Sequence, residues 1–488
     1  MIYDNKNLNL KITMRKKTMC VAMILAMATS ILAEITPENV SSLIVDDAAT
    51  TETVALFYNL HQTSKGGTIV GQHDGYSRRT GEVNVSYSAN TDIFTTTGKR
   101  PKMSGEDLMF LTDDKYDASV DWNWFRKQVA VIKESVEKSY DEHGVFTAFT
   151  WHFREPYAGK SFYASELAAD VKKKAFKSIL PEGEKHDYYK AKLDLIADFF
   201  KSLKDKNGNP IPVIFRPFHE MEGNWFWWGI PHYATAEEYK QLWQFTVKYL
   251  RDDCDVHNVL YAFAPDKQWQ NRNAYLTCYP GDDYVDILGF DSYENYSKNN
   301  YLWTKTKNQI GIIDRLAKEK NKLAALTECG YQLKDANYAK IDKLFSEHYY
   351  GVIEKANTDL AFVMFWSGSS FVPTKSDDSK NLAADLTMLF EQDGILSESN
   401  MEGSLFVLPT EDTGTATQAG IERASLYIAL AKGGLTLVGA PMGELVEVYN
   451  LSGVRIAAEK VASSQHFIAV QSGVYIVRMG DQVRKIVL

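Results

Sequence analysis

The chain has 488 residues, of which 45% are hydrophobic and 24% are charged, and its formal net charge is −9. This length is enough for a substantial buried core and for more than one domain. The acidic balance argues against a nucleic-acid partner, because phosphate binding needs a concentrated basic surface.

Residues 1–33 have the pattern of a secretory signal peptide. The basic segment Met14–Lys17 precedes an apolar run, Met19–Leu32, and the small residue Ala33. The run is shorter than the roughly 20 residues that a membrane-spanning helix needs. The polar stretch Met1–Thr13 is unusual for a signal peptide and makes Met14 a second candidate for the start. We therefore expect export to the medium or the cell surface, with the periplasm also open, and no transmembrane span.

Residues 34–396 are predicted to form one domain, in which apolar strand patterns alternate with longer amphipathic helix patterns from about residue 65 to 370. Eight strands are predicted, most of them near-continuous hydrophobic runs typical of strands buried on both faces. They are Gly67–Gln72, Pro101–Leu111, Val145–His152, Pro212–Glu220, Asn258–Ala264, Tyr284–Ser292, Leu323–Glu328 and Ala361–Ser367. Helices are predicted between them at Trp122–Tyr140, Tyr188–Leu203, Ala236–Asp252, Lys307–Lys320 and Tyr338–Ala356. Eight such units favour an α/β fold of the (β/α)₈ TIM-barrel type, although a doubly wound sheet can also reach this size.

The composition changes after the predicted barrel. Residues 397–420 are polar and rich in Ser, Thr, Gly and Glu, which is typical of a linker. Residues 421–488 show short alternating strands separated by Gly-containing turns, at Leu435–Val438, Leu445–Asn450, Val454–Ala457, Gln465–Val470, Val474–Met479 and Val483–Leu488. This pattern predicts a small C-terminal β-sandwich domain.

Three cysteines follow the predicted signal peptide: Cys254, Cys278 and Cys329. Their number is odd, and their spacing fits neither a zinc site nor a disulfide framework. A single Cys254–Cys278 bridge and three free thiols both fit the sequence.

Two glutamates close apolar strands of the predicted barrel. Glu220 ends the fourth predicted strand and Glu328 ends the seventh. A lone charged residue in such a place is often a helix cap or half of an ion pair, because burying it unpaired is costly. Two of them at the C-terminal ends of barrel strands face one cleft, which favours catalysis. Paired carboxyl groups suit glycoside hydrolysis, in which one donates a proton while the other is ionised.

The chain is rich in aromatic residues, with 10 Trp, 27 Tyr and 24 Phe. The densest cluster, Trp225–Trp228, closely follows Glu220 and can desolvate its carboxyl group, which would raise the pKa of Glu220. We expect one or two of these four residues to pack in the core and at least one Trp to face substrate. Trp366, near the end of the eighth strand, is a similar candidate platform for a sugar ring.

The histidines do not form a metal-binding pattern. The segment His219–Gly223 has Gly where the helix of a zinc protease needs its second His. No other set of His, Asp and Glu has metal-ligand spacing, so we expect neither a metal nor a cofactor. His73 and His152 fit structural roles as well as sugar contacts, and Asp291 fits a loop-capping role equally well.

Together these motifs resemble glycoside hydrolase family 26, the β-mannanase family. The resemblance covers about residues 40–395, and its most specific part is Arg216–Glu220 followed by Trp225–Gly229. The other matching segments are Gly71–His73, Trp151–His152, Gly289–Tyr293, Thr327–Glu328 and Phe365–Ser367. Cys329 stands where the family commonly has an aliphatic residue, and we expect its side chain to point away from the cleft.

The resemblance implies hydrolysis of β-1,4-mannosidic linkages within β-mannan or manno-oligosaccharides, with retention of configuration. Glu328 would be the nucleophile and Glu220 the acid/base, with His219 supporting Glu220 and Tyr293 donating a hydrogen bond to the nucleophile. The residues implied to bind substrate are His152, Trp225, Asp291 and Trp366, with Arg216 and His73 as further candidates.

Two other functions remain open. One is a related retaining β-glycanase, such as a β-1,3-xylanase or a mixed-linkage β-glucanase, because the family includes both. The other is a non-catalytic polysaccharide-binding barrel, against which the joint presence of Glu220, His219 and Glu328 argues. The segment Glu444–Leu488 is similar to the C-terminal sorting domains of Bacteroidetes-type secreted proteins, and a carbohydrate-binding or purely structural β-module is the alternative. We expect a monomer.

Overall fold

The computed structural model describes residues 34–80, 83–293, 301–333, 341, 343–353, 358–368, 370–374, 382–409, 427–431, 434–438, 442–450, 453–463, 465–471, 473–479 and 482–487. The chain divides into two compact units, Met1–Pro409 and Thr410–Leu488. The predicted signal peptide, residues 1–33, lies outside the described residues. Within the described ranges, every helix is too short or too polar to span a lipid bilayer.

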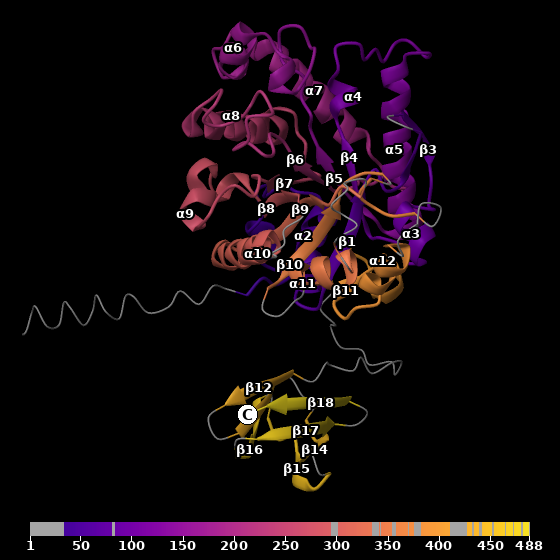
Figure 1. The fold of residues 1–488 in the computed structure, drawn as a ribbon, viewed down its shortest axis with the longest axis vertical. Coiled ribbons are helices and arrows are strands. Elements are labelled where there is room, and N and C mark those ends of the chain that lie inside the picture. Colours follow the sequence, from indigo (N-terminus) through magenta and orange to yellow (C-terminus); the bar gives the residue numbers. More distant parts are fainter. Residues whose placement is uncertain are drawn as a thin grey trace, which may run out of the picture. The chain divides into compact units, whose positions relative to one another are not determined.

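Eight parallel strands form a closed barrel in the first unit (Figure 1). They are β1 (Thr68–His73), β4 (Met103–Asp107), β5 (Phe146–Thr150), β6 (Val213–Arg216), β7 (Val259–Phe263), β8 (Ile287–Tyr293), β9 (Leu323–Gly330) and β10 (Leu360–Phe365). Each strand pairs with the next in this order, and β10 pairs with β1 through Ile69↔Phe362 and Val70↔Val363, which closes the ring. The short strand β11 (Ile395–Leu396) also pairs with β1. The predicted (β/α)₈ barrel is therefore confirmed.

The barrel strands are apolar because both of their faces are covered. In β5, β6, β7 and β10 every residue is buried. Side chains that alternate along a strand pack in different hydrophobic clusters: Phe146 and Ala148 of β5 belong to one, and Phe149 belongs to the other. Burial on both faces explains why these strands are near-continuous hydrophobic runs in the sequence.

Helices lie around the strands (Figure 1): α2 (Thr51–Ser64), α3 (Asp92–Thr97), α4 (Met109–Thr112), α5 (Trp124–His143), α6 (Ala169–Ile179), α7 (His186–Ser202), α8 (Ala236–Lys248), α9 (Arg272–Tyr275), α10 (Tyr301–Lys320), α11 (Tyr350–Ile353) and α12 (Leu382–Phe390). Short 3₁₀- or π-helical segments are η1 (Val40–Ser42), η2 (Ala164–Glu166), η3 (Tyr249–Asp253), η4 (Leu276–Cys278), η5 (Asp282–Tyr284), η7 (Leu344–Tyr349) and η9 (Glu398–Asn400). Local sequence sets the helix ends: Thr235 and Glu238 form a capping box at the start of α8, and Gly144 ends α5 in the left-handed conformation. Within the predicted helix 338–356, residues 344–353 form η7 and α11, and residues 338–340, 342 and 354–356 lie outside the described residues.

Two predicted strands end four residues earlier in the structure than predicted, and one hairpin was not predicted. The prediction Pro101–Leu111 is wrong beyond Asp107, because the Asp107 Oδ1 accepts a hydrogen bond from the Met109 N–H (2.9 Å) and α4 begins there. The prediction Pro212–Glu220 is wrong beyond Arg216, where β6 ends. The unpredicted hairpin pairs β2 (Ser77–Thr80) with β3 (Val83–Tyr87).

The first unit also extends beyond the predicted start of the linker at Ser397. Leu405 and Phe406 are buried, and the Phe406 ring packs on Tyr140 with 4.3 Å between ring centroids. The side-chain amide of Asn59 donates to the backbone carbonyls of Ser404, Leu405 and Val407 at 2.9 to 3.3 Å. Residues 397–409 are therefore part of the barrel unit, and residues 410–426 lie outside the described residues.

The second unit contains two antiparallel sheets. One has the order β12 (Tyr427–Ala431), β13 (Gly434–Val438), β16 (Gln465–Ala469), and the other has the order β15 (Arg455–Lys460), β14 (Leu445–Asn450), β17 (Val474–Met479), β18 (Gln482–Val487). Buried side chains from both sheets, among them Leu435, Ile468, Val446 and Val477, belong to one hydrophobic cluster. Strand β12 was not predicted from the sequence.

The described cysteines form no disulfide. Cys254 is partly exposed, Cys278 and Cys329 are buried, and none of the three is disulfide-bonded. The alternative of a Cys254–Cys278 bridge is therefore wrong for this structure.

Candidate active site

The predicted site residues gather at the C-terminal end of the barrel strands, where parallel strands bring their ends together. Their positions are His73 at the end of β1, His152 just after β5, Arg216 at the end of β6, His219, Glu220 and Trp225 in the loop after β6, Asp291 and Tyr293 in β8, Glu328 in β9 and Trp366 just after β10.

Arg216 binds two carboxylates from neighbouring strands. Its Nη1 donates to the Asp291 Oδ2 at 2.6 Å, and its Nη2 donates to the Glu328 Oε1. The guanidinium is 1% exposed, and although burial disfavours its charge, Asp291 and Glu328 raise the pKa of Arg216. The Thr327 hydroxyl donates to the other oxygen of Asp291 at 2.7 Å. Arg216 is thus a fixed positive charge beside Glu328.

The second oxygen of Glu328 accepts a hydrogen bond from Tyr293. The Tyr293 hydroxyl lies 2.7 Å from Oε2, as the resemblance implied. Burial raises the pKa of Tyr293 well above its ordinary value, and the negative charge of Glu328 adds to this, so the phenol stays protonated and donates. With a guanidinium on one oxygen and a phenol on the other, the carboxyl group of Glu328 is held in one orientation.

Glu220 lies in a strained turn after β6 rather than at the end of the strand. Phe218 and Glu220 both have positive φ, 48° and 53°. A residue other than glycine with positive φ raises the free energy of the fold by about 1–3 kcal/mol, so this conformation persists only where surrounding contacts hold it. Here the Glu220 N–H donates to the Ala264 carbonyl after β7 at 2.8 Å. This backbone hydrogen bond holds the turn in place and so orients the Glu220 side chain.

The carboxyl group of Glu220 is surrounded by other acids and by an indole. The Trp225 Nε1 donates to its Oε2 at 2.7 Å. Burial raises the pKa of Glu220 well above its ordinary value, the negative charges of Asp291, Glu328 and Asp266 raise it further, and the Trp225 hydrogen bond opposes them. Glu220 therefore carries a proton where an exposed glutamate would be ionised.

The indole of Trp225 is positioned by the loop that carries Glu220. A Cβ atom on Gly223 would lie 2.4 Å from the Trp225 ring, so this position requires glycine. The next three aromatic residues, Phe226, Trp227 and Trp228, are buried in the core. The expectation that one or two of the four would be core residues was therefore too low by at least one, because these rings pack on one another and on Phe176.

His219 is buried beside this pair. Burial lowers the pKa of His219 well below its ordinary value, and Arg216 and neighbouring histidines lower it further, so the imidazole is neutral. Its ring meets the His152 ring edge-on, with 4.8 Å between centroids. Among the described residues, no hydrogen bond joins the side chains of His219 and Glu220, and the supporting role of His219 stays a prediction.

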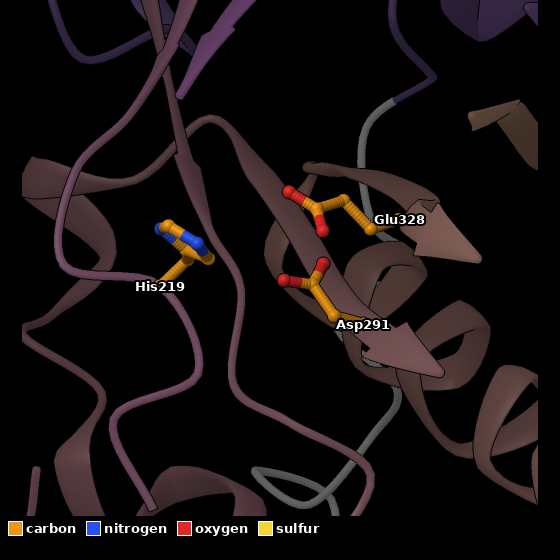
Figure 2. A group of neighbouring side chains, drawn as sticks. All are labelled: His219, Asp291 and Glu328. Carbon is orange, nitrogen blue, oxygen red and sulfur yellow. The ribbon is translucent and has the colours of Figure 1, made fainter. Parts of the chain in front are cut away.

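His219, Asp291 and Glu328 also form a group with metal-ligand chemistry. One ligand atom from each lies within 4.8 Å of the others, and Figure 2 shows both carboxyl groups turned toward the imidazole. The sequence did not predict this group, because its members come from three separate segments. Both carboxylates are already bound by the Arg216 guanidinium, with which a cation would have to compete. The arrangement is better suited to binding the two carboxylates through Arg216 than to binding a metal ion.

A cleft of about 1240 Å³ opens beside this network, and His73, His152 and Trp366 line it. The His73 ring stacks on Trp366 with 4.2 Å between centroids and 17° between planes. The His152 Nδ1 lies 2.6 Å from the Asp107 Oδ2, which fixes the imidazole. Asp291 was predicted to contact substrate, but it is fully buried and its oxygens are taken by Arg216 and Thr327.

A comparison with known protein families agrees with this arrangement of carboxyl groups. The model of "Glycosyl hydrolase family 26" matches residues 45–381. The chain belongs to glycosyl hydrolase family 26.

Two proteins of similar sequence are both named mannan endo-1,4-beta-mannosidase. A mannan endo-1,4-beta-mannosidase of Bifidobacterium adolescentis is 34% identical over 336 residues, which are 66% of this chain and 32% of that protein. The chain thus matches about a third of that relative's length. A mannan endo-1,4-beta-mannosidase of Bacillus subtilis is 28% identical over 340 residues, 66% of this chain and 83% of that protein.

Solved structures of the family share the fold. GH26C from Muricauda sp. MAR_2010_75 is 39% identical, with a TM-score of 0.71 over 77% of this chain and 99% of that one. The β-mannanase BoMan26A of Bacteroides ovatus is 28% identical, with a TM-score of 0.62 over 75% of this chain and 100% of that one.

Two acidic residues of this family 26 site were missed by the sequence interpretation. Asp107, which orients His152, ends strand β4, but the strand predicted from the sequence ran on to Leu111 and placed Asp107 in its interior. Asp266 is buried near Glu220, and it has an isolated parallel bridge to Asp291. It follows strand β7 by three residues, where the sequence offers no pattern to single it out.

Proposed function

We propose that this protein hydrolyses β-1,4-mannosidic linkages inside mannan, glucomannan or galactomannan chains, with retention of configuration. The observation that carries the proposal is the pair of buried carboxyl groups in opposite environments: Glu220 lies among acids and an indole, and Glu328 lies against Arg216. Membership of family 26 and likeness to proteins named mannan endo-1,4-beta-mannosidase support mannan as the substrate.

In the first step Glu328 is the nucleophile. Arg216 and Tyr293 hold its two oxygens, so the carboxylate is oriented before substrate arrives. It forms a bond to the anomeric carbon while the bond from that carbon to the bridging oxygen breaks. Glu220 gives its proton to the departing oxygen. The products are a glycosyl ester on Glu328, an ionised Glu220 and a free sugar hydroxyl.

In the second step Glu220 is the base. Because Glu328 is now an uncharged ester, its contribution to the raised pKa of Glu220 is lost, which favours the ionised form that the step needs. Glu220 takes a proton from water, the water oxygen bonds to the anomeric carbon, and the ester bond breaks. Two inversions give net retention.

The test is turnover of mannan by purified variants. We expect Glu328→Ala and Glu220→Ala each to lower activity at least about 10³-fold. Glu220→Ala should be partly spared on substrates with good leaving groups, because these need less protonation. Glu237→Ala, an exposed glutamate in α8, is the matched control and should act like the wild type. Near-full activity of Glu328→Ala would overturn the mechanism.

The backbone preference needs a separate comparison. The alternatives are a β-1,3-xylanase, a mixed-linkage β-glucanase and a non-catalytic binding barrel. Mannan, β-1,3-xylan and mixed-linkage glucan assayed side by side distinguish them, with product lengths followed over time. Long early products from mannan support internal cleavage, and mannobiose alone would mean attack from a chain end.

We further propose that residues 1–33 direct export and that the second unit is a small β-sandwich with a sorting role. Support comes from the basic and apolar pattern of the N-terminus and from the hydrophobic cluster that both C-terminal sheets share. In the producing cell, a chain truncated after Pro409 should keep its activity and change its distribution among medium, surface and periplasm. An unchanged distribution would contradict the sorting role.

The expected monomeric state is a separate prediction, which gel filtration with light scattering tests.

A further inference from the structure

The cleft beside the catalytic residues extends well beyond the space that a single sugar ring requires. Its volume of about 1240 Å³ exceeds the range of roughly 300–1,000 Å³ that is usual for sites of one small ligand. The lining includes His73, His152 and Trp366 next to the catalytic network, and it also includes Phe110 and Trp124 from the segment after β4. The cleft therefore has room for several units of a glycan chain.

A continuous set of contacts connects the catalytic end of this cleft to Trp124. Asp107 binds His152 through Oδ2 at 2.6 Å, and its Oδ1 accepts from the Met109 N–H at 2.9 Å, which fixes the start of α4. Phe110 in α4 then meets the Trp124 ring edge-on, with 5.5 Å between centroids and 83° between planes. The same residue that orients a histidine at the catalytic end thus also positions the support of Trp124.

Trp124 is held firmly and yet left open. Phe125 packs against it at 4.9 Å and 87°, in addition to Phe110. Asn123 caps α5 at this point by accepting from the Arg126 N–H at 2.9 Å. Despite these supports, 42% of Trp124 is exposed. A rigid tryptophan that leaves apolar surface open in a cleft marks a binding surface.

We propose that Trp124 forms a distal subsite of the cleft, where its indole stacks on a pyranose unit of the same glycan chain, remote from the bond that is cleaved. This inference rests on the proposed mannan hydrolysis and deepens it. An indole offers an apolar surface to the C–H face of a sugar ring, and Arg154 and Asp92 add polar groups to the lining for the hydroxyls. The subsite would make the enzyme favour long chains over short ones.

The chain offers a matched control two residues away. Trp122 is 80% exposed and is not part of the cleft lining. Steady-state kinetics on mannohexaose and mannotriose would be measured for the wild-type full chain, Trp124→Ala, Trp124→Phe and Trp122→Ala, with melting temperatures for each. The informative quantity is the ratio of kcat/KM for mannohexaose to that for mannotriose.

We expect Trp124→Ala to lower this ratio about tenfold, equal to about 1.4 kcal/mol. The loss should fall on KM for mannohexaose rather than on kcat, because binding remote from the reacting bond acts equally on ground state and transition state. Trp124→Phe should recover part of the ratio, and Trp122→Ala should match the wild type.

An unchanged ratio in Trp124→Ala, or an equal loss on both substrates, would overturn the subsite and leave the proposed function standing. An equal loss would also mark a structural role, which a lowered melting temperature would accompany. If the wild type cleaves neither oligosaccharide, the proposed function fails and the subsite fails with it.

Discussion

Replacing Arg216 by Met should destabilise the barrel strongly. Arg216 is 1% exposed and is the cation bound to both Asp291 and Glu328. Methionine has a similar length but no charge, so the variant leaves two buried carboxylates without their partner. Breaking a buried ion pair in this way costs about 3–5 kcal/mol, whereas an exposed pair contributes about 0–1 kcal/mol. Arg126→Met, which removes the exposed pair with Asp121, is the matched control.

The loss should depend on pH in a definite direction. Burial raises the pKa of Asp291, and Arg216 opposes that rise. Without Arg216 the pKa of Asp291 in the folded state rises further above its unfolded value, so the folded protein binds more protons than the unfolded one. The stability of the variant therefore falls further than that of the wild type as pH rises through the folded-state pKa values of Asp291, so the deficit should increase with pH.

Urea unfolding followed by tryptophan fluorescence measures this deficit for the barrel alone, because all 10 tryptophans lie between residues 122 and 366. A deficit under about 1 kcal/mol at pH 8, the range of an exposed pair, would refute the role of Arg216 as the neutralising cation. So would a deficit that does not increase as pH rises.

Three further predictions concern the surroundings of the site and the end of the barrel unit. Asp266→Asn removes a negative charge that raises the pKa of Glu220, so the alkaline limb of the pH profile of kcat/KM should move to lower pH; an unmoved or raised limb would contradict this. Gly223→Ala places a Cβ 2.4 Å from the Trp225 ring and should displace that indole, lowering kcat by up to about 10²-fold with little change in melting temperature. Phe406→Ala should cost about 3–5 kcal/mol of barrel stability in the same urea assay, whereas a true linker residue would cost almost nothing.

The barrel was predictable because its strands are buried on both faces. Runs such as Leu360–Phe365 stand out in the sequence for this reason. The strand ends were less predictable, because they depend on single local features. The Met109 N–H donates to Asp107 where α4 begins directly after β4, and a left-handed turn at Phe218 precedes Glu220. Residues 397–409 look like a linker in composition, and only the tertiary contacts of Asn59 and Phe406 make them part of the barrel.

The individual site residues were predictable, and the connections among them were not. Strand-end placement identified Glu328 and, four residues beyond its strand, Glu220. The bonds from Arg216 to Asp291 and to Glu328 span 75 and 112 residues of sequence, and they exist because closure of the barrel brings β6, β8 and β9 together. The spacing of these residues in the sequence does not indicate that they are in contact. For this reason Arg216 and Asp291 were predicted to bind substrate rather than each other.

The most direct test of the proposed chemistry is to trap the glycosyl-enzyme. In a 2-deoxy-2-fluoro-β-mannosyl fluoride, the fluorine at C2 slows both steps, whereas the fluoride on the anomeric carbon is a good leaving group in the first step. A covalent adduct should therefore accumulate in a retaining enzyme. Intact-mass measurement followed by peptide mapping would locate the adduct. We predict one label per chain, on Glu328, and none in Glu328→Ala. A label on Glu220 or another carboxylate would contradict the assignment, as would the absence of an adduct together with products of inverted configuration.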